Sequence, residues 1–212
     1  MSQTVDKIIL FTLAACPTGR NMGTILREVG EKYPSIKLKT VYVEIDIEMT
    51  NHYRIKTNPT LLFLNREDKE LFRLEGFHET EEINDIIREI NQNKRSSTQT
   101  REPNKGTTEN YTIFLLKSGK PTAVKVQHYN ETSIKAPRIT IINILLGADV
   151  KAYENPFPKD SKLDSVEFNR SLAKITIKTK TDPSIVNIKQ METLLLKTLE
   201  SFDIHKINLS FL

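Results

Sequence analysis

The sequence predicts an α/β domain with a mixed sheet and helices on both faces, joined by a polar linker to a smaller α+β domain. Residues 1–93 show strand and helix signals in the order β-α-β-α-β-β-α, which is typical of such a sheet. Residues 94–109 are polar and show no apolar periodicity, which is typical of a flexible linker. Residues 110–212 mix strand pairs with two helical segments. We therefore divide the chain at these boundaries.

Apolar runs and helical spacing predict the elements of the first domain in order. Strands are predicted at 5–11, 37–46, 60–65 and 70–75. Helices are predicted at 18–32 and 79–92, with a short helix or turn at 48–53. The strand at 60–65 is apolar at nearly every position, as in the centre of a sheet. Thr80 is the expected cap of the last helix.

Apolar runs and helical spacing also predict the elements of the second domain. Strands are predicted at 111–117, 122–128, 163–169, 172–179 and 206–212. Helices are predicted at 137–146, ended by Gly147, and at 188–201. The turn at 118–121 joins the first two strands, and the third and fourth form a hairpin.

Composition excludes several classes of protein. The 38% hydrophobic and 27% charged residues indicate a globular chain, and no apolar run is long enough to span a membrane. Cys16 is the only cysteine, so a disulfide scaffold is excluded. Residues 96–212 carry 17 Lys+Arg and 12 Asp+Glu, a net +5, without aromatic residues interleaved in a basic motif. This pattern indicates a solvated basic surface and no nucleic-acid partner.

The N-terminus lacks the basic start and long apolar core of a signal peptide. We therefore expect a cytoplasmic protein, with an extracytoplasmic location left open if the natural chain starts earlier. The four histidines lie far apart, without cysteine or carboxylate at ligand spacing, so neither a metal nor another cofactor is expected. They are His52, His78, His128 and His205.

The segment Cys16-Pro17-Thr18-Gly19-Arg20 is the only candidate for chemistry. It lies between a predicted strand and a predicted helix, where unpaired N–H groups at the helix N-terminus favour a thiolate. Cys16 is therefore the candidate catalytic nucleophile. Gly19 in the first helical turn costs up to about 1 kcal/mol relative to alanine, which suggests a close approach of backbone there.

The first domain resembles thioredoxin in three ordered segments. Residues 11–22 parallel the thioredoxin active-site segment, residues 53–63 resemble the conserved-proline loop, and residues 75–77 complete a likeness that covers about 5–92. The resemblance implies a cis peptide before Pro59, facing Cys16, and a groove for an extended peptide. The groove residues it implies are Pro17, Thr18, Gly19, Arg20, Asn58, Pro59 and Thr60.

The departures from thioredoxin are as informative as the likeness. Gly19 replaces the second cysteine, Leu10 the buried aspartate, and Ala15 the usual tryptophan. Without a second thiol the domain cannot release its own mixed disulfide, so it is not a self-sufficient dithiol reductase. Two hypotheses stay open. One is a binding domain for a protein, peptide or thiol partner, and the other is a monothiol oxidoreductase in which Cys16 depends on an external small-molecule thiol.

The second domain resembles the GerMN domain of sporulation and spore-germination proteins of endospore-forming bacteria. The likeness lies in residues 142–147, 158–166 and 195–207 and covers about 110–212. It implies an α+β domain with a binding or assembly role, sporulation proteins as partners and no known chemistry. Members of that family usually lie outside the cytoplasmic membrane.

Overall fold

The computed structural model describes residues 4–95, 102–182 and 186–212. They form two compact units, of which unit 1 takes in the chain up to Thr107 and also Glu131–Ile134. Unit 2 consists of Thr108–Asn130 and Lys135–Leu212. The chain therefore passes between the units three times, whereas the sequence predicted one passage at 94–109. The middle of that expected linker lies outside the described residues.

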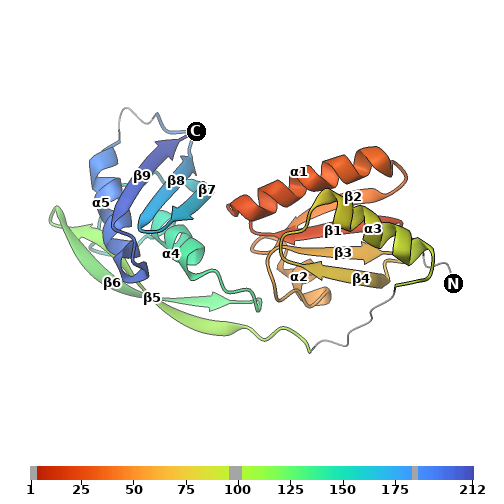
Figure 1. Cartoon of the computed structure of the whole chain (residues 1–212). Helices are drawn as coiled ribbons and strands as arrows, with labels where there is room; N and C mark the ends of the chain where they lie inside the picture. The colour runs from red at the N-terminus through yellow and green to blue at the C-terminus, as the bar shows by residue number, and fades with distance from the viewer. Residues whose placement is uncertain (1–3, 96–101, 183–185) are drawn as a thin grey trace. The chain divides into compact units, whose positions relative to one another are not determined.

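Unit 1 is built on a four-stranded sheet in the order β2-β1-β3-β4 (Figure 1). Its strands are β1 (Lys7–Thr12), β2 (Lys37–Tyr42), β3 (Thr60–Leu64) and β4 (Glu70–Glu75). β1 pairs parallel with β2 and antiparallel with β3, and β3 pairs antiparallel with β4. All five residues of β3 are buried, which confirms the prediction of a central strand.

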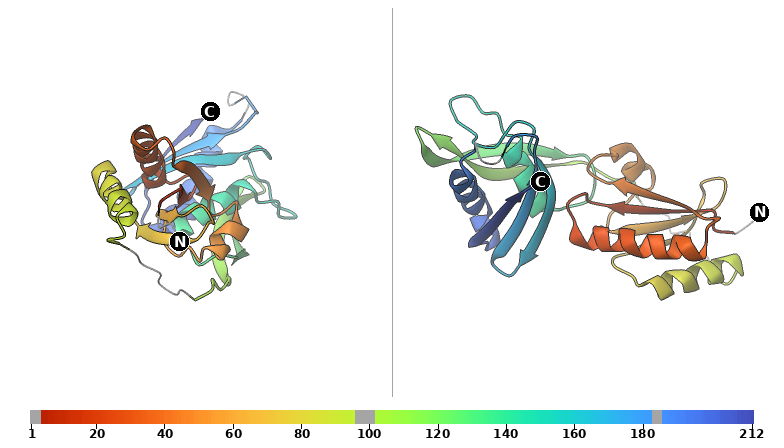
Figure 2. Two further views of the ribbon diagram at one scale, coloured as in Figure 1. Left: turned by 90° about the vertical axis from the view of Figure 1, so that its right-hand side faces the viewer. Right: turned by 90° about the horizontal axis from the view of Figure 1, so that it is seen from above.

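Three helices cover both faces of this sheet, as predicted (Figure 2). α1 (Pro17–Lys32) and α3 (Thr80–Asn91) pack against each other on one face, and α2 (Ile47–His52) lies on the other. α1 and α3 each bury one stripe of apolar side chains at helical spacing. The stripes are Met22, Ile25, Leu26 and Val29 in α1, and Ile83, Ile86, Ile87 and Ile90 in α3. Together with the apolar face of the sheet they form the core of unit 1.

Two local predictions for unit 1 were wrong. Thr80 does not cap α3, because its hydroxyl donates to Glu28 Oε2 at 2.6 Å and the N-cap residue is Glu79, without a side-chain cap. The second strand ends at Tyr42 instead of residue 46, because the carbonyl of Tyr42 accepts hydrogen bonds from the amides of Ile45 and Asp46 at 2.9 and 2.8 Å. These bonds form a turn. Asp46 then caps α2, its side chain accepting from the Met49 amide at 3.1 Å.

Unit 2 contains a two-stranded and a three-stranded sheet. β5 (Thr107–Lys117) and β6 (Lys120–Asn130) form a hairpin whose turn residues, Ser118 and Gly119, have φ of 50° and 72°. Positive φ at both turn residues is typical of a type I′ hairpin. β5 begins at Thr107, inside the expected linker. In the second sheet, β8 (Leu172–Lys178) lies between antiparallel β7 (Lys162–Asn169) and parallel β9 (Lys206–Phe211).

Two helices complete unit 2. α4 (Pro137–Leu146) contacts β7, α5 (Ile188–Leu199) contacts β9, and the helices contact each other. α5 was predicted to reach residue 201 but ends at Leu199, followed by the short 3-10 helix η2 (Glu200–Phe202). Among the described residues, no helix is long and apolar enough to cross a membrane.

Candidate functional site

Cys16 lies at the junction of a turn and the first helix of unit 1. Its amide donates to the carbonyl of Leu13 at 3.1 Å, which closes the turn, and its carbonyl accepts from the Arg20 amide at 3.1 Å, which begins α1. Pro17 is the first helical residue, where a missing amide hydrogen costs nothing. The Cys16 side chain makes no capping hydrogen bond and is half-buried. The thiol is therefore held at the helix start and stays accessible.

Asn58 joins the Cys16 turn to the loop before β3. Its Oδ1 accepts from the Leu13 amide at 2.9 Å, and its Nδ2 lies 3.5 Å from Cys16 Sγ, within donor range of the sulfur. The peptide between Asn58 and Pro59 is cis, which confirms the expectation drawn from the resemblance. One side chain thus holds the sulfur and the loop together, although more than forty residues of chain separate them.

Gly19 is buried directly beneath Thr12 at the end of β1. A Cβ atom at position 19 would lie 1.8 Å from Thr12 Oγ1 and 2.8 Å from Thr12 Cβ. The sequence suggested a close approach of backbone, but the atoms that crowd position 19 belong to the Thr12 side chain. The position where a second cysteine would stand has no room for a side chain.

The eight residues predicted for this site divide by exposure. Pro17 and Arg20 are exposed, Cys16, Thr18 and Asn58 are half-buried, and Gly19, Pro59 and Thr60 are buried. The Thr60 hydroxyl donates to the Thr57 carbonyl at 2.7 Å, so it is engaged within its own loop. The first five of these residues are therefore open to solvent at least in part, and the last three are not.

Glu44 also belongs to this region, and sequence reasoning missed it. Its Oε1 accepts from the Ala14 amide at 2.7 Å, in the turn that precedes Cys16. Burial of the carboxyl group raises the pKa of Glu44, and the hydrogen bond from Ala14 acts in the opposite direction. The residue as a whole is nevertheless exposed. Nothing in the sequence marked Glu44, because it stood in a predicted strand outside any motif.

An exposed aromatic residue lies next to the cis-proline loop. The Gly76 amide donates to the Pro59 carbonyl at 2.8 Å, and Gly76 has a φ of 95°, which favours glycine. The next residue, Phe77, is 46% exposed. The His78 amide then lies 3.4 Å from Met22 Sδ in α1. Phe77 therefore adds apolar surface beside Pro59, although the sequence pointed to it only as part of the resemblance.

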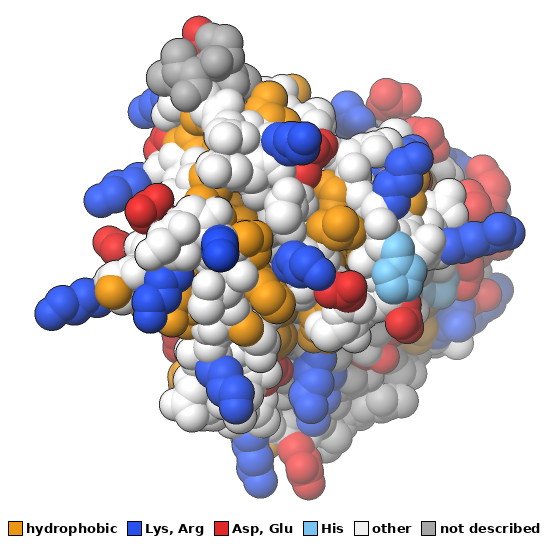
Figure 3. Space-filling model, turned by 90° about the vertical axis from the view of Figure 1, so that its left-hand side faces the viewer, with side chains coloured by type: hydrophobic (Ala, Val, Ile, Leu, Met, Phe, Trp, Pro, Cys, Tyr) orange, Lys and Arg blue, Asp and Glu red, His pale blue; other side chains and the backbone are white. Residues whose placement is uncertain are grey.

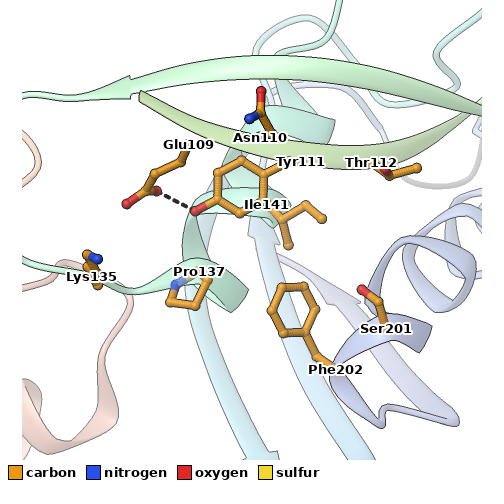
Figure 4. A pocket seen from close by; sticks show the side chains of 9 residues that line it. All are labelled: Glu109, Asn110, Tyr111, Thr112, Lys135, Pro137, Ile141, Ser201 and Phe202. Carbon is orange, nitrogen blue, oxygen red and sulfur yellow. Dashed lines mark hydrogen bonds between the residues drawn. The ribbon is translucent and has the colours of Figure 1, made fainter. Parts of the chain in front are cut away.

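Unit 2 contains a separate cavity of about 450 Å³ between β5, the start of α4 and η2 (Figure 4). Its lining residues are Glu109, Asn110, Tyr111, Thr112, Lys135, Pro137, Ile141, Ser201 and Phe202. The Tyr111 hydroxyl donates to Glu109 Oε2 at 2.5 Å. Burial of the ring, followed by the contact with Glu109, raises the pKa of Tyr111 to about 12. Sequence reasoning missed this cavity because three separate segments without a motif form it.

The described residues contain no cluster of side chains suited to bind a metal ion. No three His, Cys, Asp or Glu side chains gather there closely enough to hold a metal ion.

Comparisons with known proteins find similarity only among solved structures. No family model matches the chain, and no curated protein is found similar to it. Fasciola hepatica thioredoxin is similar at 20% identity and a TM-score of 0.37, over 41% of this chain and 82% of its own. Desulfothioredoxin from Desulfovibrio vulgaris Hildenborough is similar at 24% identity and a TM-score of 0.37, over 41% of this chain and 83% of its own. Chloroplastic thioredoxin z is similar at 22% identity and a TM-score of 0.37, over 42% of this chain and 80% of its own.

These similarities are too distant to carry an activity over to this chain. The thioredoxin-like α/β fold of unit 1 is evident from its own strand order, its helices on both faces and its cis-proline loop beside Cys16.

Proposed function

We propose that unit 1 binds a peptide or a thiol-bearing protein where Cys16 meets the loop of Asn58 and Pro59. The observation that carries this proposal is the double contact of Asn58 with the Leu13 amide and the Cys16 sulfur. It holds a half-buried thiol beside the loop of Pro59, whose carbonyl accepts from the Gly76 amide, one residue before the exposed Phe77. A surface of this composition suits an extended chain that offers apolar side chains and a sulfur.

Where the partner carries a disulfide, the covalent step of this proposal is thiol–disulfide exchange. The Cys16 thiolate attacks a disulfide of the partner, a bond forms between Cys16 Sγ and one partner sulfur, and the other sulfur leaves as a thiolate. Since Cys16 is the only cysteine, this chain has no second thiol that could release the mixed disulfide. The partner's own thiolate can reverse the step, or an external small-molecule thiol can attack the partner sulfur. That attack by the small-molecule thiol releases the Cys16 thiolate and leaves a disulfide between the partner and the small molecule.

Glutathione disulfide is a suitable probe of this step. We expect the full chain to acquire one glutathione adduct, seen by mass spectrometry, and reduced glutathione to remove it. Cys16→Ser is the matched control and should acquire none. A wild-type chain that stays unmodified, while its thiol is still alkylated after unfolding in urea, would contradict the exchange step.

The alternative function is a monothiol oxidoreductase, and Glu44 favours it. This carboxyl group has a raised pKa and accepts a hydrogen bond from the Ala14 amide. It therefore offers a group that can carry a proton beside the turn that precedes Cys16. Reduction of insulin disulfides by glutathione separates the two functions. Turnover that is abolished in Cys16→Ser establishes the enzyme, whereas adduct formation without turnover establishes the binding protein.

We also propose a GerMN-like binding role for unit 2, in the sporulation or germination of an endospore-forming bacterium. The support is the likeness of residues 142–147, 158–166 and 195–207, together with the α+β arrangement of the unit. The protein level is then expected to rise after the onset of sporulation, measured by immunoblotting of a time course in the source organism. A constant level in vegetative and sporulating cells would contradict this role.

A further inference from the structure

The backbone of β5 is only partly paired along the edge that faces away from β6. Leu116 exchanges two hydrogen bonds with Glu154, at 2.9 and 2.8 Å, and the Phe114 amide donates to Thr198 Oγ1 at 3.0 Å. Backbone groups alternate in direction along a strand, so the even-numbered residues of β5 turn their N–H and C=O groups to this edge. Asn110 and Thr112 therefore present theirs to the same edge.

Two prolines explain why the chain does not cover this edge itself. Glu154 pairs antiparallel with Leu116, and continuing that register would place Pro156 opposite Phe114 and Pro158 opposite Thr112. Proline has no amide hydrogen and cannot extend a ladder. The chain leaves the edge at this point. No side chain or loop in the described ranges makes a hydrogen bond to the edge-facing backbone of Asn110 or Thr112.

The cavity of unit 2 runs along this uncovered stretch. Four consecutive strand residues, 109–112, line it, and consecutive residues of a strand share one pocket only when it follows the strand's edge. The facing wall is apolar, formed by Pro137, Ile141 and Phe202. Figure 4 shows the Phe202 ring pointing toward Ile141, below the strand. The volume of about 450 Å³ lies in the range of pockets that hold ligands.

Glu109 and Lys135 are the charged residues that line the cavity, so it is the net positive charge of unit 2 as a whole, together with Lys135, that favours an acidic occupant. Both carboxylate oxygens of Glu109 are engaged, one by Tyr111 and the other by Asn130 Nδ2 at 3.3 Å. Lys135 is exposed and has no ion-pair partner among the described residues. Unit 2 carries 15 Lys+Arg against 10 Asp+Glu, a net +5. Figure 3 shows Lys and Arg side chains spread over the near face, with apolar patches between them.

We propose that the edge of β5 at Asn110–Thr112 receives an extended acidic peptide segment of a partner protein as an added antiparallel strand. Its backbone pairs with the free N–H and C=O groups of the edge, and one apolar side chain enters the cavity over Ile141 and Phe202. Its carboxylate lies near Lys135. Strand addition of this kind takes its affinity from main-chain hydrogen bonds and its specificity from side-chain pockets. The site is independent of the one proposed around Cys16.

A defined peptide tests the site on the full chain. The probe is the acetylated and amidated hexapeptide TVTLTE with a fluorescent label, titrated by anisotropy. We expect saturable binding, and at least threefold weaker binding of the uncharged counterpart TVTLTQ. The substitution Lys135→Gln should abolish that preference. A peptide N-methylated at alternate residues, which cannot donate to the edge, should bind at least tenfold more weakly.

Two variants of the strand itself complete the test. Thr112→Pro removes the outward amide while leaving the side of β5 that pairs with β6 intact, so it should lose binding, and Thr112→Val should retain it. Equal binding of the N-methylated and unmodified peptides overturns the proposal even if Thr112→Pro fails to fold. Absence of saturable binding also overturns it. A concentration-dependent dimer that Thr112→Pro abolishes would assign the edge to a second copy of this chain instead.

Discussion

Alanine at position 19 would place its Cβ in the space that Thr12 occupies. The distances from that Cβ are 1.8 Å to Thr12 Oγ1, 2.8 Å to Thr12 Cβ and 3.1 Å to Thr12 Cγ2. Since Thr12 Cβ is itself too close, no rotamer of Thr12 removes the clash. Overpacking of a buried site costs about 1–3 kcal/mol, and the gain in helix propensity returns at most about 1 kcal/mol. We expect Gly19→Ala to lower the free energy of unfolding by about 1–2 kcal/mol.

Urea denaturation followed by circular dichroism measures this change, and Gly23→Ala in the same helix is the control. A Cβ at position 23 meets nothing within 4 Å, so that variant should be as stable as the wild type or more stable. In the double variant Thr12→Ala/Gly19→Ala, only part of the loss should be recovered, because the contacts with Oγ1 and Cγ2 are removed while the contact with Cβ at 2.8 Å remains. Equal stability of the two glycine variants would refute the reasoning.

The remaining predictions concern three polar side chains. Burial raises the pKa of Glu44, so its ionised form opposes folding and that cost grows as the pH rises through the folded-state pKa. Glu44→Gln keeps an acceptor for the Ala14 amide and should be more stable than the wild type at pH 7, by no more than about 0.5 kcal/mol at this partly exposed site, with the difference vanishing near pH 4. For Tyr111, the difference in ultraviolet titration between wild type and Tyr111→Phe should show a group with a pKa of about 12. Asn58→Ala should slow alkylation of Cys16 by iodoacetamide, because the amide that supports the thiolate is lost, and should cost about 1 kcal/mol of stability.

Each of these three predictions can be contradicted by one result. A loss of stability in Glu44→Gln at pH 7 that persists at pH 4 would contradict the first prediction. A difference titration centred near the ordinary tyrosine pKa would show that Tyr111 is not shielded. Faster alkylation in Asn58→Ala would show that this side chain covers the thiol more than it supports the thiolate.

Much of unit 1 could be predicted because its elements are marked by apolar pattern. β3 is a short run that is apolar at nearly every position, and the isoleucines of α3 recur at helical spacing. Boundaries were less predictable where hydrogen bonds decide them. Val43 and Ile45 continued the apolar pattern of β2, yet the turn bonds to the Tyr42 carbonyl end that strand earlier.

The candidate site could be predicted only where the chain resembles a known pattern. Cys16 was named from its place between a strand and a helix and from the likeness, and Pro59 and Gly19 were named as groove residues from the likeness. Glu44 was missed because its importance comes from a contact with Ala14 that has no local signature. β5 extended into the predicted linker because Thr107–Glu109 are polar residues held by strand pairing, which an apolar pattern does not reveal.

The short return of the chain to unit 1 has a consequence for attempts to divide this protein. Asn51 Nδ2 donates to the Glu131 carbonyl at 3.1 Å, and Thr132 and Ile134 are each only 7% exposed. A fragment that stops at residue 93 leaves this piece of unit 1 behind. Proteolytic cleavage near residue 100 should likewise yield two products that elute together, since the second product carries Glu131–Ile134 and the first carries Asn51. The two halves of the sequence are therefore not two independent proteins in tandem.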